Sequence, residues 1–410
     1  MISSSPFDPI KIGPITLRNR FIKSGANEGR TFEGAPSKSL VDHHCEVALG
    51  GVGMTTCAYF SVSEAGRTLG NQTWLRRGIL PDLRALADGV HSGAAAISAQ
   101  ITHGGSFTQV PQKGATLSSS PGINCAGLMQ GNFFQRAMNE RDMEQVTQEF
   151  IVGAQLCREA GFDAVEIHMG HGYLLNQFIS PLSNRRRDQY GGSPENRARF
   201  PARVLSRVKE AVGKDMAVIA KINVADGVPG GATAQDGAVT AQVLEAAGAD
   251  LLVLSGGRNV ESTWFTFGSP LNQAEFAKVI KSSPLACLMI WLASLSTPKD
   301  LHFREMYFLE LSRQIRAAVK MPLGYLGGVK SLANAQTALD EGFDCIVLAR
   351  ALIHDTQLIN KFRDGTATRS GCTSCNACVP YIYHPAGTWC VLNPPNDLAS
   401  NRIPARAAGE

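Results

Sequence analysis

The sequence predicts an α/β protein built on a closed parallel TIM-type (β/α)8 barrel, with an N-terminal hairpin and loop insertions over the carboxyl face. Eight short segments are apolar at almost every position, as expected of strands buried on both faces. Helical patterns alternate with these segments, and 410 residues are enough to bury one large core. Because such alternation favours a closed barrel inside a ring of helices, the active site is expected at the carboxyl ends of the strands.

The expected elements follow one another in a regular order. The strands are expected at residues 20–24, 52–59, 95–101, 164–168, 217–222, 251–254, 323–326 and 344–348. The helices are expected at 40–49, 83–90, 143–160, 195–212, 238–247, 309–319, 332–341 and 356–363. Two short strand-like pieces within residues 9–20 predict a hairpin that closes the floor of the barrel.

Two connections, 104–140 and 256–300, are longer than a barrel needs. Long loops on the catalytic face usually carry specificity, so both are expected to cover the mouth. Trp264, Phe265 and Phe267 belong to the second connection and are expected near the ligand.

Composition and charge exclude several classes of protein. A net charge of +4 is too small and too dispersed for a nucleic-acid partner. The N-terminal residues contain no apolar core of a secretory signal, and the apolar run 284–295 is too short to span a bilayer. Six of the ten cysteines, at 45, 57, 125, 157, 287 and 345, are scattered singly. These features predict a reduced, cytoplasmic protein with a small-molecule substrate, either monomeric or homo-oligomeric.

Three polar rings follow the strand at 164–168, namely His168, His171 and Tyr173. Two histidines three positions apart after a strand can aim their ring nitrogens at one point and hold an oxygen. Histidine hydrogen-bonds a carbonyl in either protonation state, and a nearby tyrosine can deliver a proton to carbon. From these residues alone, a zinc pair or two satisfied core histidines remain alternatives.

The wider stretch HMGHGYLLNQFISPLSNRRRDQYGGSPENR, residues 168–197, is long and unusual. It resembles the signature of the old yellow enzyme family of FMN-dependent oxidoreductases. The resemblance implies that NADH or NADPH reduces FMN and that the reduced flavin passes a hydride to the β-carbon of an enone. His168 and His171 would then hold the carbonyl oxygen, and Tyr173 would protonate the α-carbon. No G-x-G-x-x-G follows a strand, so a separate nicotinamide-binding domain is not expected.

A flavin mononucleotide needs backbone donors for its phosphate and a positive charge where reduction places negative charge. Small residues before helix starts offer the donors at the two last strands, at Gly327, Gly328 and Ala349, and Arg350 can clamp the phosphate or the ring. Gly327-Gly328 could instead form only a tight turn. Lys221 lies in an apolar strand, where its ammonium would face the barrel mouth and stabilise the reduced flavin.

The resemblance implies further flavin contacts. Gln100 stands where the family has a glutamine at the pyrimidine edge of the flavin. Ser24, Gly25 and Ala26 match the segment that backs the ring, although Gly25 and Ala26 depart from the usual family residues. Tyr59 is expected to contribute a backbone contact.

The remaining four cysteines are clustered, in a C-x2-C-x2-C run with a fourth cysteine twelve positions further on, and they are Cys372, Cys375, Cys378 and Cys390. Structural zinc usually takes two separated C-x2-C pairs, whereas this spacing suits a [4Fe–4S] cluster better. Zinc and free thiols remain alternatives. The expected organisation is therefore an FMN-binding barrel at 1–370 and a cysteine-containing extension at 371–410, packed on the barrel.

The cysteine run also resembles the iron–sulfur subgroup of the same family, which includes dienoyl-CoA reductase and trimethylamine dehydrogenase. This implies an alternative function, a flavin and iron–sulfur dehydrogenase or a dienoyl-CoA-type reductase. The chain is expected to end about where the barrel ends, so electrons would then pass to or from an external partner protein. A third alternative is a barrel without flavin that binds a sugar phosphate.

Overall fold

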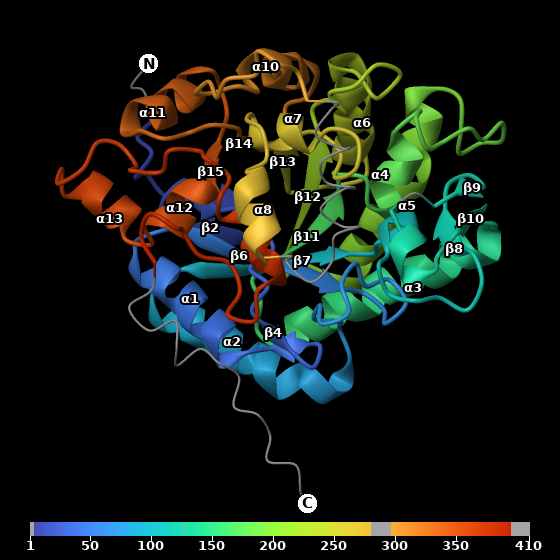
Figure 1. The fold of residues 1–410 in the computed structure, drawn as a ribbon. Coiled ribbons are helices and arrows are strands. Elements are labelled where there is room, and N and C mark those ends of the chain that lie inside the picture. The colour runs from blue at the N-terminus through green and yellow to red at the C-terminus, as the bar shows by residue number, and fades with distance from the viewer. Residues whose placement is uncertain (1–3, 125, 280–296, 395–410) are drawn as a thin grey trace, which may run out of the picture.

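The computed structural model describes residues 4–124, 126–279 and 297–394. Cys125, Cys287, the apolar run 284–295 and residues 395–410 of the predicted extension lie outside this part of the chain. The eight predicted strands form a closed barrel at the centre of the molecule, with helices arranged around it (Figure 1). The predicted fold class is thereby confirmed.

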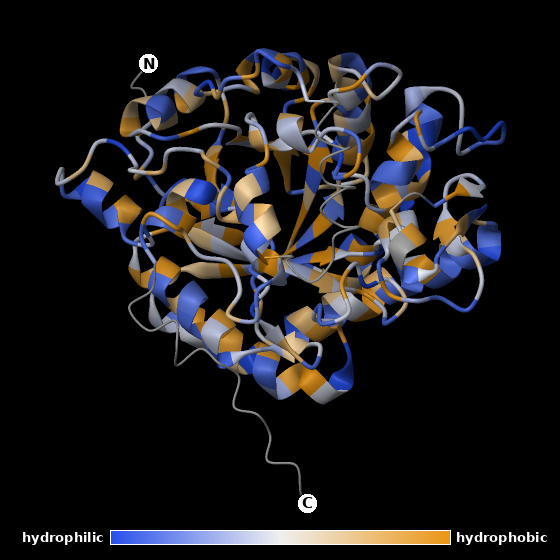
Figure 2. Cartoon of the chain, viewed as in Figure 1, coloured by the Kyte–Doolittle hydropathy of each residue, from blue (hydrophilic) through white to orange (hydrophobic). Residues whose placement is uncertain are grey.

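The barrel strands are all parallel, and the hydrogen-bonded order closes from the last strand onto the first. Their bounds are β3 Phe21–Lys23, β6 Met54–Ser61, β7 Ala96–Thr102, β11 Ala164–Met169, β12 Ala217–Asn223, β13 Leu251–Ser255, β14 Leu323–Leu326 and β15 Cys345–Leu348. Each strand is buried along nearly its whole length, and Figure 2 shows these apolar strands inside a more hydrophilic rim. Since both faces of every strand are covered, side chains that point inward meet at the barrel axis.

The floor of the barrel is closed by the predicted hairpin, formed by β1 Ile10–Ile12 and β2 Ile15–Leu17. Ile12 and Leu17 are fully buried and belong to the cluster of apolar side chains inside the barrel. The turn requires glycine at position 13, because φ is +55° and an added Cβ would lie 2.5 Å from the carboxylate carbon of Asp250. The active site is therefore expected at the opposite, carboxyl end of the barrel.

The outer helices match the predicted order, and several begin earlier than the apolar pattern suggested. They are α1 Lys38–Leu49, α2 Leu80–Ser92, α3 Glu140–Glu159, α5 Pro194–Val212, α6 Ala234–Ala246, α10 Leu309–Ala318, α11 Leu332–Asp340, α12 Arg350–His354 and α13 Leu358–Arg363. Helix α3 starts three residues before its predicted position, because Asn139 and Asp142 form a capping box ahead of the first apolar residue. No helix of the described ranges is long and apolar enough to cross a membrane.

Two excursions and the C-terminal segment lie over the carboxyl face. The first excursion contains a small sheet of β8 Thr116–Ser118, β9 Gly122–Ile123 and β10 Phe134–Ala137, which the sequence did not predict. The described part of the second contains α7 Thr263–Phe267 and α8 Gln273–Val279. Helix α8 contacts the 3-10 turn at Val379–Tyr383, so the C-terminal segment and the second excursion together form one side of the mouth (Figure 1).

Candidate active site

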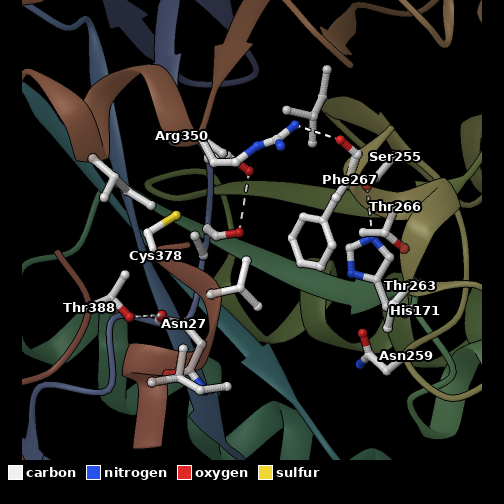
Figure 3. A pocket seen from close by; sticks show the side chains of 18 of the residues that line it. Asn27, His171, Ser255, Asn259, Thr263, Thr266, Phe267, Arg350, Cys378 and Thr388 are labelled. Atoms are coloured by element: carbon white, nitrogen blue, oxygen red, sulfur yellow. Dashed lines mark hydrogen bonds between the residues drawn. The ribbon is translucent and has the colours of Figure 1, made fainter. Parts of the chain in front are cut away.

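A cavity of about 400 Å³ opens at the carboxyl ends of the strands. This volume lies within the range of small-molecule sites. The strand ends form its floor, the second excursion forms one wall, and the C-terminal segment forms another (Figure 3). The cavity therefore lies where barrel topology predicts an active site.

The three predicted rings meet at the wall that follows β11. The ring centroids of His168 and His171 are 4.9 Å apart, and those of His168 and Tyr173 are 4.6 Å apart. All three side chains line the cavity. A ligand oxygen held by the imidazoles would therefore lie beside the phenol.

His168 is a hydrogen-bond donor to the cavity. Its Nδ1 accepts from the backbone N–H of Gly170 at 3.2 Å, so the proton of the neutral ring resides on Nε2. Burial, followed by the proximity of His171 and Lys221, holds the pKa of His168 well below its usual range. The ring is thus neutral at physiological pH and presents one N–H.

Three hydrogen bonds hold His171, two through its backbone and one through its ring. Its backbone N–H donates to Asn223 Oδ1 at 3.1 Å, and its carbonyl accepts from Asn259 N at 3.1 Å. These bonds hold a left-handed backbone with φ +59°. The ring Nε2 lies 2.8 Å from Ser255 Oγ (Figure 3), and burial lowers the pKa of His171 to about 3.

Tyr173 caps the N-terminus of α4 Leu174–Ile179 and is 5% exposed. Its ring contacts Tyr59, with centroids 5.3 Å apart, and Phe107, with centroids 5.5 Å apart. Burial, followed by the neighbouring Tyr59, raises the pKa of Tyr173 well above its usual range. The hydroxyl therefore keeps its proton until a strong base, such as a carbanion, forms next to it.

The side chain of Tyr59 points into the cavity, which the expectation of a backbone contact did not include. Its hydroxyl lies 2.7 Å from Thr68 Oγ1, and Thr68 Oγ1 donates to Gln72 Oε1 at 3.1 Å. An amide oxygen can only accept, so the Thr68 proton is committed to Gln72, and Tyr59 must donate to Thr68. Because the Tyr59 hydrogen is used in this bond, the lone pairs of the Tyr59 oxygen remain free on the side of Tyr173.

The predicted flavin-side residues lie together on the floor. Ser24, Gly25, Ala26, Gln100 and Lys221 all line the cavity. The Lys221 ammonium is 1% exposed and donates to Ser24 Oγ at 3.1 Å and to the Gly25 carbonyl at 3.2 Å. An added Cβ at Gly25 would lie 2.6 Å from Gln100 Nε2, so a larger residue at this departure from the family pattern would displace the Gln100 amide.

The sequence interpretation missed the acidic partner of this lysine. Glu166 Oε1 lies 3.0 Å from Lys221 Nζ and accepts from Gln100 Nε2 at 2.6 Å. It precedes His168 by two positions in β11, so both side chains point into the barrel. That alternation was the available signal, since a lone acid in an apolar strand needs a buried partner.

At the opposite end, Gly328, Ala349 and Arg350 line the cavity, whereas Gly327 does not. An added Cβ at Gly327 would lie 2.9 Å from the Phe308 ring, which agrees with a tight-turn role for this glycine. The Arg350 guanidinium donates to Asn376 Oδ1 at 2.6 Å and to the Phe267 carbonyl at 2.7 Å. It therefore connects the second excursion to the C-terminal segment, and Figure 3 shows Arg350 beside Phe267.

Lys330 is a further cavity-lining cation that the sequence interpretation missed. Its Nζ lies 5.6 Å from the centroid of Phe303, beside Gly328. Of the three aromatic residues expected near the ligand, Phe267 lines the cavity. Phe265 instead packs on Phe308, with ring centroids 5.1 Å apart.

The four clustered cysteines line one small second pocket beside the cavity, and Cys372 and Cys378 line both spaces. The eight described cysteines are free thiols, and burial raises the pKa of Cys378 to about 12. Within the described ranges, no three His, Cys, Asp or Glu side chains are grouped as ligands of one metal ion. His354 Nδ1 lies 3.3 Å from Cys390 Sγ.

Comparison with known proteins identifies similar sequences along most of the chain. A model of the NADH:flavin oxidoreductase / NADH oxidase family matches residues 5–264. The 4,4'-dithiodibutanoate disulfide reductase of Rhodococcus erythropolis is 40% identical over 395 residues, which are 95% of this chain and 95% of that protein. An NADH oxidase of Thermoanaerobacter brockii is 29% identical over 397 residues, which are 95% of this chain and 56% of that protein.

Among solved structures, an old yellow enzyme homologue from Zymomonas mobilis has the same barrel fold. It superposes with a TM-score of 0.69 at 22% identity, covering 91% of this chain and 96% of that chain. At this level of identity, the similarity concerns the fold.

Proposed function

The chain belongs to the NADH:flavin oxidoreductase / NADH oxidase family, and from that premise we propose that it reduces the activated C=C bond of an α,β-unsaturated carbonyl compound. Family membership makes it an FMN-dependent NAD(P)H oxidoreductase. The observation that carries the finer proposal is the contact between His168 and Tyr173 at the cavity wall. A neutral N–H donor beside a protonated phenol suits a carbonyl oxygen next to a carbon that accepts a proton.

The cavity fits FMN in three respects. Lys221 supplies a buried positive charge on the floor, where the reduced ring would carry negative charge. Gln100 supplies an amide at the same end. Gly328, Lys330 and the residues before α12 supply small residues and a cation at the other end, as a phosphate requires. When bound, FMN supplies the hydride that it has received from NADH or NADPH.

Binding and polarisation of the substrate fall to His168. Its Nε2–H donates to the carbonyl oxygen, and that bond strengthens as negative charge accumulates on the oxygen. His171, held by Ser255 and Asn223, adds a second polar ring at 4.9 Å. Because both rings are neutral, the oxygen is stabilised by fixed dipoles.

Proton delivery falls to Tyr173. After hydride reaches the β-carbon, the α-carbon holds an electron pair as an enolate. The Tyr173 hydroxyl, whose high pKa keeps it protonated, delivers its proton to that carbon. The product is the saturated carbonyl compound.

The first experiment records the visible spectrum of the purified protein before and after NADPH is added without air, and then after 2-cyclohexenone is added. We expect a flavin spectrum that NADPH bleaches and that the enone restores, with cyclohexanone as the product. Restoration by air but not by the enone would refute C=C reduction while leaving the flavin assignment intact. A colourless protein would favour the sugar-phosphate barrel.

A second candidate reaction is the reduction of a disulfide, because the 40% identical relative is a 4,4'-dithiodibutanoate disulfide reductase. The residues proposed for C=C reduction would also be sufficient for disulfide reduction. Hydride adds to one sulfur, the S–S bond breaks, and its electron pair leaves on the other sulfur, which takes a proton from Tyr173. Reoxidation by 4,4'-dithiodibutanoate with release of two thiols per NADPH, and no reoxidation by enones, would assign this reaction instead.

We propose further that Cys372, Cys375, Cys378 and Cys390 hold a [4Fe–4S] cluster. A single zinc would require sulfur atoms about 3.8 Å apart, which follows from bonds of about 2.3 Å in a tetrahedron. In a cube each thiolate binds a different iron, so the four thiols can be further apart while lining one pocket. The C-x2-C-x2-C spacing and the shared pocket therefore support the cube over zinc.

Iron and labile sulfide in protein purified without air would support this cluster, at about four of each per chain. Zinc in their place would refute it. If flavin reduction by NADPH is slow and reduction by a small iron–sulfur donor protein is fast, the dehydrogenase with an external electron partner becomes the better assignment.

A further inference from the structure

Glu166 is a buried acid that does not line the cavity. It is 1% exposed, and it lies on β11 opposite Gln100 of β7. Both of its cavity-side neighbours, Gln100 and Lys221, bind the same carboxylate oxygen, at 2.6 Å and 3.0 Å. Glu166 therefore lies directly beneath two cavity-lining residues.

The position is costly for a charged group. Placing a carboxylate in a barrel interior carries a desolvation cost of several kcal/mol, and a buried ion pair often stabilises a fold no better than apolar side chains of the same volume. The surrounding strand is apolar, with Val165 and Ile167 on either side. Stability of the barrel alone therefore does not account for an acid here.

The contacts of Lys221 define what the acid does. The ammonium donates to Ser24 Oγ and to the Gly25 carbonyl, and it forms an ion pair with Glu166 Oε1 at 3.0 Å. The charge is thus held in one place on the floor of the cavity. The carboxylate at 3.0 Å offsets most of that charge at any point several ångströms away.

Glu166 also determines how Gln100 is oriented. A carboxylate oxygen accepts and the amide NH2 donates, so Gln100 must turn its NH2 toward Glu166. The amide oxygen is then the free group of Gln100. A ligand edge that meets this residue must bring an N–H.

We propose that Glu166 is a positioning residue that lowers the reduction potential of the bound flavin by offsetting the Lys221 charge, and that it orients Gln100 to accept from an N–H of the ring. This inference rests on FMN binding in the function proposed above. A lower potential makes the reduced flavin a stronger hydride donor to an alkene. Glu166 touches neither cofactor nor substrate and acts through its two neighbours.

A second buried pair provides the matched control. Lys23 donates to Glu28 Oε1, and the two residues are 1% and 4% exposed, yet neither lines the cavity. Glu28→Gln therefore removes a carboxylate from the same kind of pair, at residues that do not line the cavity. A general effect of breaking a buried ion pair should appear in both Glu166→Gln and Glu28→Gln. An effect of the local charge on the flavin should appear in Glu166→Gln alone.

The test measures the midpoint potential of the flavin in the holoenzyme and its affinity for sulfite, an anion that adds to oxidised flavin. Both are measured at pH 6 for every variant. We expect Glu166→Gln to bind sulfite at least tenfold more tightly, with a potential raised by at least about 30 mV, the two-electron equivalent of a tenfold change. Glu28→Gln should change neither.

Three further variants test the proposal even if Glu166→Gln does not fold. Lys221→Gln should lower the potential, and Lys221→Gln combined with Glu166→Gln should bring it back toward the wild-type value. If Glu166→Gln does not fold, the rise between these two Lys221→Gln proteins carries the test. Glu166→Asp should shift the potential less than Glu166→Gln.

An unchanged or lowered potential in flavin-loaded Glu166→Gln, or no difference between the two Lys221→Gln proteins, would overturn the inference while leaving the proposed function intact. A wild-type protein that holds no flavin would overturn both.

Discussion

Two of the cavity walls are held in different ways, namely the wall that follows β11 and the C-terminal segment with the clustered cysteines, which is the cysteine wall. The wall of His168, His171 and Tyr173 begins inside a barrel strand and continues directly into helix α4. The cysteine wall belongs to an irregular segment, and side-chain hydrogen bonds hold it in place. Asn376 donates to the carbonyls of Ser269 and Pro270, at 3.1 Å and 2.8 Å, and accepts from Arg350.

The difference between the two walls corresponds to the different tasks of their side chains. The rings that contact the substrate lie on a barrel strand and on the short turn that follows it, where the adjoining closed sheet tolerates little displacement. Groups that only need to lie near the cofactor are attached afterwards by polar contacts. A substitution that disrupts one wall should therefore leave the other wall intact. The following predictions test this independence, from the largest expected effect to the smallest.

Tyr173→Phe should have the largest effect, because it removes the proton donor alone. We expect enone reduction by the reduced protein to slow by about 10²–10⁴-fold, while flavin reduction by NADPH stays within about twofold. Stopped-flow absorbance measures each half-reaction separately. Tyr190→Phe, which lies outside the cavity, serves as the control, and equal loss in both half-reactions would refute the role.

Asn376→Ala should detach the cysteine wall. It removes the amide that bridges Arg350, Ser269 and Pro270, and it leaves a left-handed residue with φ +56°. We expect about 2–4 kcal/mol of local destabilisation, seen as faster cleavage of the segment after residue 370 by a protease. Enone reduction by Tyr173 should persist, and equal loss of both walls would contradict their independence.

His168→Ala should weaken the binding of phenol ligands, which place an oxygen against the imidazole. Loss of one hydrogen bond to a charged or polarised oxygen costs about 1.5–3 kcal/mol, or about 10–150-fold in Kd. Titration of the flavin spectrum with a phenol measures this affinity. His91→Ala on the exposed face of α2 is the control, and unchanged affinity in His168→Ala would argue against the oxygen contact.

Tyr59→Phe tests the hydroxyl series that ends at Gln72. The variant keeps the ring against Tyr173 and removes only its oxygen, so we expect a change of about 2–10-fold in enone reduction, corresponding to one neutral hydrogen bond. Single-turnover kinetics provides the measurement. A loss as large as that of Tyr173→Phe would instead make Tyr59 the proton donor.

The pH dependence should be the smallest effect in the working range. Burial lowers the pKa of His171 to about 3 and that of His168 well below 6.5, so neither ring titrates between pH 5 and 8. We expect the rate of enone reduction to be flat across this range, and an inflection near pH 6.5 that disappears in His171→Ala would refute it.

Stability should respond to pH in a direction that follows from the buried histidines, namely His171 and also His103, which follows β7 and is 5% exposed. The folded pKa values lie below the unfolded value of 6.5, so the unfolded chain binds more protons as the pH falls. The contribution is fully present above about pH 6.5 and is lost progressively toward the folded values of about 3 for His171 and about 4 for His103. Urea unfolding at pH 7 and pH 5 measures it, and equal stability would contradict buried neutral rings.

Much of the active site could be anticipated because it is local in the chain. The stretch from His168 to Tyr173 carries its own spacing, and strand alternation places it at the carboxyl face. Lys221 could be assigned for the same reason, since it stands near the end of an apolar strand, whereas Gln100 was assigned from the family resemblance.

Other features depend on pairs that are distant in sequence. Glu166 meets a lysine 55 positions away, and Asn376 meets residues more than one hundred positions away. Tyr59 faces Tyr173 because β6 and the turn after β11 converge at the mouth, which a pattern of apolar residues does not encode.

The sequence by itself determined the barrel, the plugged floor, the family and the three rings, because each depends on periodicity or on neighbours within a few positions. Only the tertiary structure decided which acid offsets Lys221, which side chains brace the cysteine segment, and which way the Tyr59 hydroxyl points. Those choices depend on distances between strand ends, and only closure of the sheet sets such distances.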